Sequence, residues 1–177
     1  ARMKLLLTVG AQMPFDRLVL AMDAWAAANP SARVAAQIGD STVNATHLEA
    51  QRFLEPARFD LACDEADAIV GHAGIGTLFA ALERGKPVLV LPRRADLRET
   101  RNDHQLATAR RFGERPGVVV VWEERELPEG LERLTALVRR SHGNAHAPLR
   151  CGSLTCAHDS RAAMLAGALL QLTPRES

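Results

Sequence analysis

The sequence predicts an α/β protein built on a doubly wound parallel sheet. Three short apolar runs, Ala68–Val70, Val88–Leu91 and Gly117–Val121, show no alternation with polar residues, which is typical of strands covered on both faces. Segments with helical character separate these runs, and strands that alternate with helices favour a parallel sheet. In such sheets ligands bind at the carboxyl ends of the strands, near the point where the strand order reverses.

The first half of the chain keeps this alternation. A strand is expected over Lys4–Val9, a helix over Pro14–Ala28, and a second strand over Arg33–Ile38. Pro14 suits the first turn of a helix, and Asn29 with Pro30 ends it. The segment His47–Glu55 is ambiguous and is expected to hold a short strand near Arg52–Leu54.

The remaining elements complete one domain over residues 1–140. Further helices are expected over Arg58–Glu65, Ile75–Arg84, Asn102–Phe112 and Glu129–Arg140. A polar loop should follow at 141–159. An apolar helix rich in alanine and leucine is then expected at 160–172, packed on the same domain or on a partner.

Composition narrows the function classes. A chain of 177 residues with 47% hydrophobic content is long enough to bury one substantial core. The net charge is only +1, so the electrostatic footprint of a nucleic-acid-binding protein is missing. Three cysteines, with no secretory signal and no apolar run long enough to cross a bilayer, predict a cytoplasmic location. Ala1 and Arg2, which precede Met3, are expected to be additions to the natural chain.

The segment Gly71–Leu82 is the most informative part of the chain. A short apolar run enters a turn with three glycines and one histidine, and a helix-forming run follows at once. The helix N-terminus then opens above the end of a strand, where free N–H groups and the helix dipole favour an anion. The alternative is a tight turn that only packs closely against a helix, with His72 capping its own turn.

Two familiar phosphate-binding motifs are excluded by spacing. Glycines at 71, 74 and 76 do not form the dinucleotide motif G-x-G-x-x-G. The pair Gly85–Lys86 lies at a helix end and is followed by Pro87, which does not fit a P-loop.

Several ordered motifs carry a family resemblance. The segments Gly71–Thr77, Gly85–Pro92 and Asn102–Gln105 together resemble the C-terminal, donor-binding domain of glycosyltransferase family 28, to which MurG belongs. The opening Thr8–Leu18 and the pair Arg93–Arg94 look most similar to the small PssE-type subunits of bacterial exopolysaccharide glycosyltransferases. The resemblance covers roughly residues 3 to 125 and implies the Rossmann-like half of a two-domain GT-B enzyme.

The resemblance implies a half-enzyme. Such a subunit would bind a nucleotide diphosphate sugar, with a uridine-diphosphate sugar expected, and would serve an inverting transfer in exopolysaccharide synthesis. A separate membrane-associated, PssD-like subunit would supply the lipid-linked acceptor and the catalytic base. The chain would therefore lie in the cytoplasm, peripheral to the inner membrane through that partner, would be inactive alone, and would need neither metal nor cofactor.

The resemblance also assigns site residues. His72, Ala73, Gly74, Gly76 and Thr77 would face the donor diphosphate, where preorganised N–H donors stabilise the charge that develops on the leaving group. Asn102, His104 and Gln105 would hold hydroxyls of the donor sugar, and Gly10 would lie close to the bound donor. For Asn102–Gln105 a helix N-cap is the alternative, and both roles can hold together.

One position departs from the family. A glutamate that binds both ribose hydroxyls is usual where this chain has Ala80. The loss of such a charge-assisted hydrogen bond would weaken binding by roughly 1.5–3 kcal/mol. Glu83, three residues on, is the candidate replacement for ribose contact, against a plain surface role.

Two further features stay open. The loop around Arg93 and Arg94 could contact phosphates or the partner, or could form solvated ion pairs. The tail holds five potential metal ligands whose spacing fits no zinc knuckle, so a polar loop is favoured: His142, His146, Cys151, Cys156 and His158.

The alternative functions are of two kinds. A nucleotide-binding or scaffold module that has lost turnover is made credible by Ala80. A sugar-nucleotide epimerase of GT-B architecture is disfavoured by a chain with one half-length domain.

Overall fold

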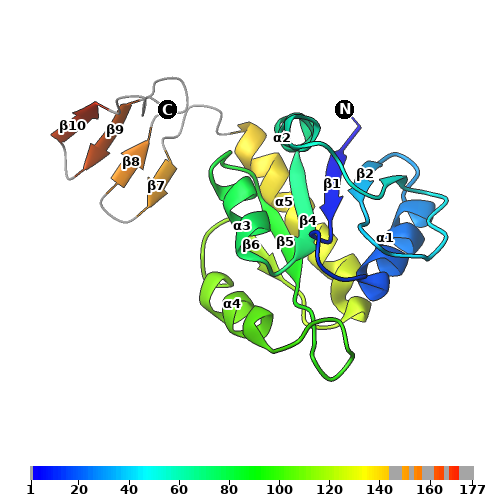
Figure 1. Cartoon of the computed structure of the whole chain (residues 1–177). Helices are drawn as coiled ribbons and strands as arrows, with labels where there is room; N and C mark the ends of the chain where they lie inside the picture. The colour runs from blue at the N-terminus through cyan, green and yellow to red at the C-terminus, as the bar shows by residue number, and fades with distance from the viewer. Residues whose placement is uncertain (1, 144–148, 152–153, 157–161, 166–167, 172–177) are drawn as a thin grey trace. The chain divides into compact units, whose positions relative to one another are not determined.

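The computed structural model describes residues 2–143, 149–151, 154–156, 162–165 and 168–171. The chain divides into two compact units, Ala1–Val138 and Arg139–Ser177, which are described separately. The first unit holds a sheet with helices on both faces (Figure 1).

The sheet of the first unit has six parallel strands in the order β3-β2-β1-β4-β5-β6. Their bounds are β1 (Lys4–Thr8), β2 (Arg33–Gln37), β3 (Glu49–Gln51), β4 (Ala68–His72), β5 (Val88–Leu91) and β6 (Val118–Val120). The predicted doubly wound parallel sheet is thus confirmed. The order of the strands reverses between β1 and β4, so the topological switch lies between these two neighbours.

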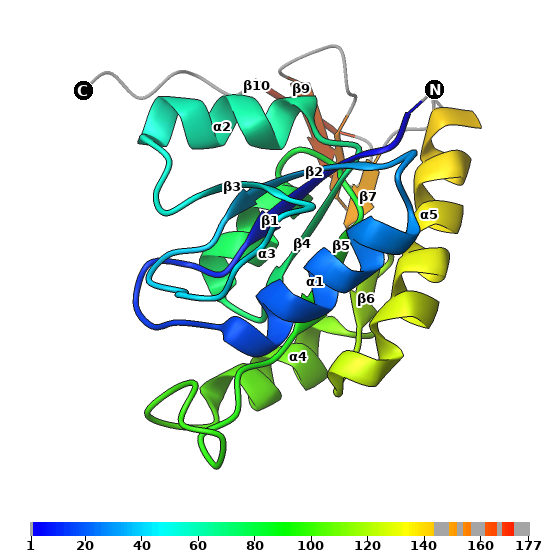
Figure 2. The ribbon, with the colours of Figure 1, turned by 90° about the vertical axis from the view of Figure 1, so that its right-hand side faces the viewer.

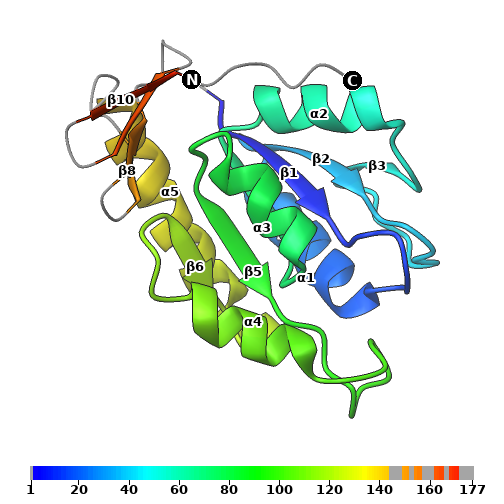
Figure 3. The ribbon, with the colours of Figure 1, turned by 60° about the vertical axis from the view of Figure 1, so that its left-hand side comes forward.

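Helices cover both faces of this sheet. Helices α1 (Asp16–Ala28) and α5 (Leu127–Gly143) lie on one face (Figure 2), and α2 (Pro56–Glu65), α3 (Ile75–Leu82) and α4 (His104–Phe112) lie on the other (Figure 3). Successive residues of β1 serve the two layers: Leu5 and Leu7 pack toward α1, and Leu6 packs toward α2 and α3. All three leucines are buried because strand side chains alternate between faces.

Strand β3 lies three residues before its predicted position. All three of its residues are exposed, so no apolar run marks this edge strand in the sequence. Its place is fixed by pairing with β2. One further hydrogen bond, from Ile38 N–H to the Gln51 carbonyl, extends this pairing beyond the end of β2. The other predicted strands and helices of this unit are confirmed within a few residues at their ends.

The predicted helix at 160–172 is wrong for the described residues of that range. These form strands β9 (Ala162–Leu165) and β10 (Ala168–Gln171) of an antiparallel sheet, with β7 (Leu149–Cys151) and β8 (Leu154–Cys156). A short apolar run without a polar period does not distinguish strand from helix, and the strands are defined by their pairing, in which Leu165 lies opposite Ala168.

The predicted polar loop at 141–159 also contains regular structure. It includes the last turn of α5 and strands β7 and β8. Of the five potential metal ligands, His142 lies in α5, Cys151 in β7 and Cys156 in β8, while His146 and His158 lie outside the described residues. No helix within the described ranges combines the length and apolar character that a membrane span needs.

Candidate functional site

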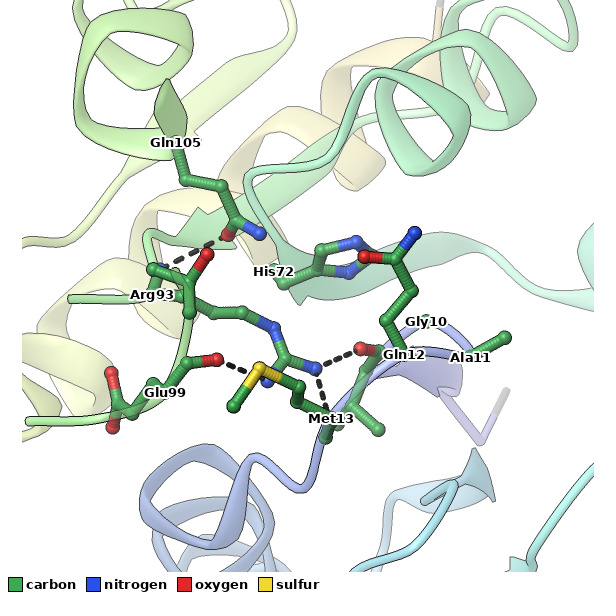
Figure 4. A pocket seen from close by; sticks show the side chains of 10 residues that line it. Gly10, Ala11, Gln12, Met13, His72, Arg93, Glu99 and Gln105 are labelled. Atoms are coloured by element: carbon green, nitrogen blue, oxygen red, sulfur yellow. Dashed lines mark hydrogen bonds between the residues drawn. The ribbon is translucent and has the colours of Figure 1, made fainter. Parts of the chain in front are cut away.

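A cavity of about 70 Å³ opens at the carboxyl edge of the sheet, at the switch between β1 and β4. One wall is the loop from β1 to α1, and the other is the loop from β5 to α4 (Figure 4). His72, the last residue of β4, lines the cavity between them. The full lining consists of Val9, Gly10, Ala11, Gln12, Met13, His72, Arg93, Glu99, Thr100 and Gln105.

Gly10 is required by the close approach of the His72 ring. It adopts φ +76°, a conformation that suits glycine. A Cβ at this position would also lie 2.9 Å from Cε1 of His72. The predicted place of Gly10 beside the site is therefore consistent with the structure, and its role here is to make room for the ring.

The His72 ring is held between two glycines and a threonine. A Cβ on Gly74 would lie only 2.2 Å from Nε2 of His72, so this position also excludes a side chain. The hydroxyl of Thr77 lies 3.3 Å from Nδ1 of the ring. Thr77 is 5% exposed, so its hydroxyl orients the histidine and does not line the cavity.

His72 is neutral at physiological pH. Burial and the nearby Arg93 cation lower the pKa of its ring from 6.5 to about 4. A hydrogen bond with the Thr8 main chain raises the pKa but does not offset these two effects. A neutral imidazole carries one N–H donor and one acceptor nitrogen. The single N–H of the neutral His72 ring bonds the Thr8 main chain, so the ring gives a ligand neither a full charge nor a second N–H donor.

The N-terminus of α3 opens next to His72, as the sequence predicts. Gly74 is the N-cap residue and provides no side-chain cap, and Leu78 N–H donates to the Gly74 carbonyl at 3.1 Å. The helical amides before Leu78 have no carbonyl one turn back to bond. Ile75 and Gly76 are exposed, and a Cβ on Gly76 would meet nothing within 4 Å.

The three glycines of the motif therefore do different things. Gly71 and Gly74 pack too tightly for a side chain, since a Cβ on Gly71 would lie 2.7 Å from the Thr8 carbonyl oxygen. This supports close packing, the alternative raised for the motif, at these two positions. Gly76 is different because its missing side chain leaves open space at the helix start.

Gln105 points its amide into the cavity from the first turn of α4. Its Oε1 accepts a hydrogen bond from Arg93 N–H at 3.0 Å, which fixes the orientation of the amide. The amide nitrogen is thereby turned toward the His72 side of the cavity (Figure 4). Gln105 thus presents N–H donors to any group that occupies the cavity.

Arg93 is buried, with the residue only 4% exposed, so the solvated ion pair considered for this loop is wrong at this position. Nη1 donates to the carbonyls of Pro14 and Glu99, and Nη2 donates to those of Val9 and Met13. These four bonds use every N–H of the two terminal nitrogens. The guanidinium also lies 4.7 Å from the centre of the Phe15 ring.

Ion pairs support the rest of the same loop. Arg17 binds Glu99 through Nε at 2.7 Å and Nη2 at 2.9 Å, and also donates to the Pro92 carbonyl. Arg94 pairs with Asp96 at 2.7 Å and with Glu123 at 3.0 Å, as the ion-pair alternative predicts.

Several residues assigned by the resemblance lie outside the cavity lining. Asn102 and His104 are exposed at the start of α4, where Asn102 Oδ1 accepts from His104 N–H at 3.3 Å. The N-cap alternative is wrong for Asn102, because the N-cap residue of α4 is Asp103, which makes no side-chain cap hydrogen bond. Ala73 is buried, and Glu83 is exposed at the far end of α3 from Gly74. The structure thus brings together Gly10, His72 and Gln105, with Gly74 and Thr77 holding the ring.

The sequence interpretation missed part of the lining. Residues 11–13 form much of one wall, and Glu99 and Thr100 belong to the other. Their only sequence signal is position, because both loops follow predicted strands at the edge where ligands bind in such sheets.

The comparison with protein families decides the relationship. Residues 5–150 match the model of the glycosyltransferase family 28 C-terminal domain. The chain belongs to this family. The predicted resemblance to family 28 is therefore confirmed. No curated protein sequence gave a significant match.

Solved glycosyltransferases share the fold of this family 28 domain. The glycotransferase of kitacinnamycin superposes with a TM-score of 0.60 at 23% identity, over 81% of this chain and 38% of its own. CalG4, the calicheamicin glycosyltransferase, gives 0.54 at 19% identity, over 80% and 37%. VinC, solved in complex with dTDP, gives 0.52 at 23%, over 79% and 36%. This chain thus spans less than two fifths of each of these proteins.

Proposed function

We propose that this chain is the donor-binding part of a two-component inverting glycosyltransferase. It would bind a nucleotide diphosphate sugar, with the diphosphate at the turn from β4 to α3. A uridine-diphosphate sugar is the expected donor. A membrane-associated, PssD-like partner would supply the lipid-linked acceptor and the base, in exopolysaccharide synthesis.

One observation supports this proposal most. The open N-terminus of α3 and the cavity lined by His72 and Gln105 lie at one edge of the sheet, at the topological switch. Helix N-termini bind anions through free amides and the helix dipole. The Gln105 amide adds donors for phosphate or sugar oxygens. Because these donors are already in place, we expect binding to need no metal.

The size of the cavity supports the two-component part. About 70 Å³ cannot enclose a whole nucleotide sugar, since ligand pockets for such molecules reach roughly 300–1,000 Å³. Most of the donor would lie along the open edge, where a second protein half can cover it.

A substitution at Gly76 tests the proposed diphosphate position. In Gly76→Ala the new methyl group meets nothing within 4 Å, so the fold should be kept. Helical Cβ atoms tilt toward the helix N-terminus, so the methyl group would stand where a phosphate approaches the amides. We expect the wild-type chain to bind one of UDP, GDP or dTDP in calorimetry, also in EDTA, and the variant to bind it about tenfold more weakly, the equivalent of 1.4 kcal/mol.

The outcome separates the proposal from its alternatives. Unchanged affinity in Gly76→Ala would place the diphosphate elsewhere. Absence of binding to all three nucleotides in the wild-type chain would reject the donor site altogether.

A second candidate function is a nucleotide-binding module without turnover. It is favoured by Ala80, which offers no carboxylate for a ribose, and by Glu83, which lies outside the cavity lining. The variant Glu83→Ala tests whether Glu83 replaces the ribose-binding glutamate. An unchanged affinity for the bound nucleotide would show that it does not.

A further inference from the structure

We infer that Arg93 is a positioning residue of this site, whose guanidinium sets the separation between the two loops that form opposite walls of the cavity. This inference rests on the proposed function for its ligand. It assigns to Arg93 a role that is neither phosphate binding nor surface ion pairing.

The bonds of Arg93 join both walls. Three of the carbonyls that it binds belong to the β1–α1 loop, namely those of Val9, Met13 and Pro14, and the fourth is that of Glu99 in the β5–α4 loop. Arg93 itself belongs to the second loop, so its side chain crosses from one wall to the other (Figure 4).

The main chain of Arg93 adds a link to the ligand-facing side. Its N–H donates to Gln105 Oε1 and so turns the Gln105 amide nitrogen into the cavity. One residue therefore sets the spacing of the walls and the orientation of a lining donor.

Burial makes this arrangement specific for arginine. The guanidinium is packed against the Phe15 ring and has four carbonyl partners in fixed directions. A lysine ammonium has three donors on a flexible stem and cannot satisfy four carbonyls in two loops. The two cations have the same charge, so Arg93→Lys distinguishes a positioning role from a simple electrostatic one.

Arg84 provides a matched control. It is also a partly buried arginine with several partners, since it binds Asp60, Asp64 and the Ala80 carbonyl. These partners lie on α2 and α3, and none of them lines the cavity. Arg84→Lys should therefore lower stability without changing the site.

The experiment measures calorimetric affinity for whichever of UDP, GDP or dTDP the wild-type chain binds, at a temperature where each variant is folded. Binding groups must be held within about 0.5 Å of their productive positions, so we expect Arg93→Lys to bind about ten- to a hundredfold more weakly. Arg84→Lys should bind within about twofold of wild type. Equal affinities for Arg93→Lys and wild type would overturn the inference, as would an equal loss in Arg84→Lys.

Two additions keep the test decisive. If Arg93→Lys does not fold, Phe15→Leu removes the ring beneath the guanidinium and should weaken binding in the same direction, and unchanged affinity would overturn the inference. If the wild-type chain binds no nucleotide, the proposed function fails, but NMR titration of His72 still tests Arg93. Opening of the walls in Arg93→Lys should raise the pKa of His72 from about 4 toward 6.5, and an unchanged value would overturn the inference.

Discussion

At the scale of single residues, the site works through a histidine that carries no charge. His72 lies between Gly10 and Gly74, close to the buried cation of Arg93, and both burial and that cation oppose protonation. Positive potential for an anion therefore comes from Arg93 and from the N-terminus of α3, and not from His72.

The lowered pKa of His72 predicts a stability change with pH. The unfolded chain binds the proton near pH 6.5 and the folded chain only near pH 4, so protonation favours unfolding. The contribution is complete above pH 6.5 and is lost as the pH falls from 6.5 to about 4, by about 3 kcal/mol. Denaturant unfolding of wild type and His72→Gln across this range measures it.

The comparison with His72→Gln isolates this one group. Carboxylates with lowered pKa, such as those of Glu49 and Glu124, also reduce stability in acid, but they are present in both proteins. The difference between the two proteins should therefore shrink as the pH falls. A constant difference from pH 7 to pH 4 would contradict a buried neutral His72.

A second residue-scale prediction concerns the glycines of the motif. Gly74→Ala would bring a methyl group 2.2 Å from the His72 ring, and such overpacking costs about 1–3 kcal/mol. Gly76→Ala, its control in the same turn, should be neutral or more stable by up to about 1 kcal/mol. Thermal unfolding of both variants measures this contrast, and equal midpoints would show that the ring moves away at no cost.

At the scale of elements, the two ends of α3 have separate roles. The N-terminus of α3 is open beside the cavity, whereas the segment after its C-terminus completes another helix. Lys86 Nζ donates to the carbonyls of Asp64 and Ala66 at the end of α2. The lysine of the Gly85–Lys86 pair is therefore a helix cap, which agrees with the exclusion of a P-loop at this point.

Removal of this cap should destabilise α2. Lys86→Met leaves the last carbonyls of α2 without their donor, at a cost of about 1 kcal/mol per hydrogen bond. Arg58→Met, on the exposed surface of the same helix, should change the free energy of unfolding by less than about 0.5 kcal/mol. Urea unfolding of both variants checks the difference. A loss for Lys86→Met no larger than that for Arg58→Met would contradict the capping role.

Element prediction succeeded where burial was complete. Strands β4, β5 and β6 were visible as apolar runs because helices cover both of their faces. Strand β3 has no buried residue, so only its pairing with β2 defines it. The strands at 162–165 and 168–171 likewise depend on partners that a local apolar pattern does not identify.

At the scale of the whole molecule, the site lies on an open sheet edge. The cavity is too small for a complete donor, and the proposed function assigns the acceptor and the base to a partner. We therefore expect the purified chain to bind a nucleotide diphosphate without transferring its sugar. Mixing it with membranes that contain the acceptor-binding partner should start transfer. The transfer is measured as the appearance of radiolabelled sugar in the lipid fraction. Transfer by the chain alone would contradict the two-component proposal.

The sequence by itself determined the alternation of strands and helices, the glycine turn at the start of α3, and the membership of family 28. These are properties of contiguous segments, because local apolar period and turn residues act within one element. The tertiary structure alone decided that Arg93 joins two cavity walls, that Thr77 orients His72, and that Glu83 and His104 lie outside the lining. These roles depend on contacts between residues up to 84 positions apart, which local sequence patterns do not show. Arg93 is an arginine that such patterns place on the surface, and only the fold buries it and gives it carbonyl partners in two loops.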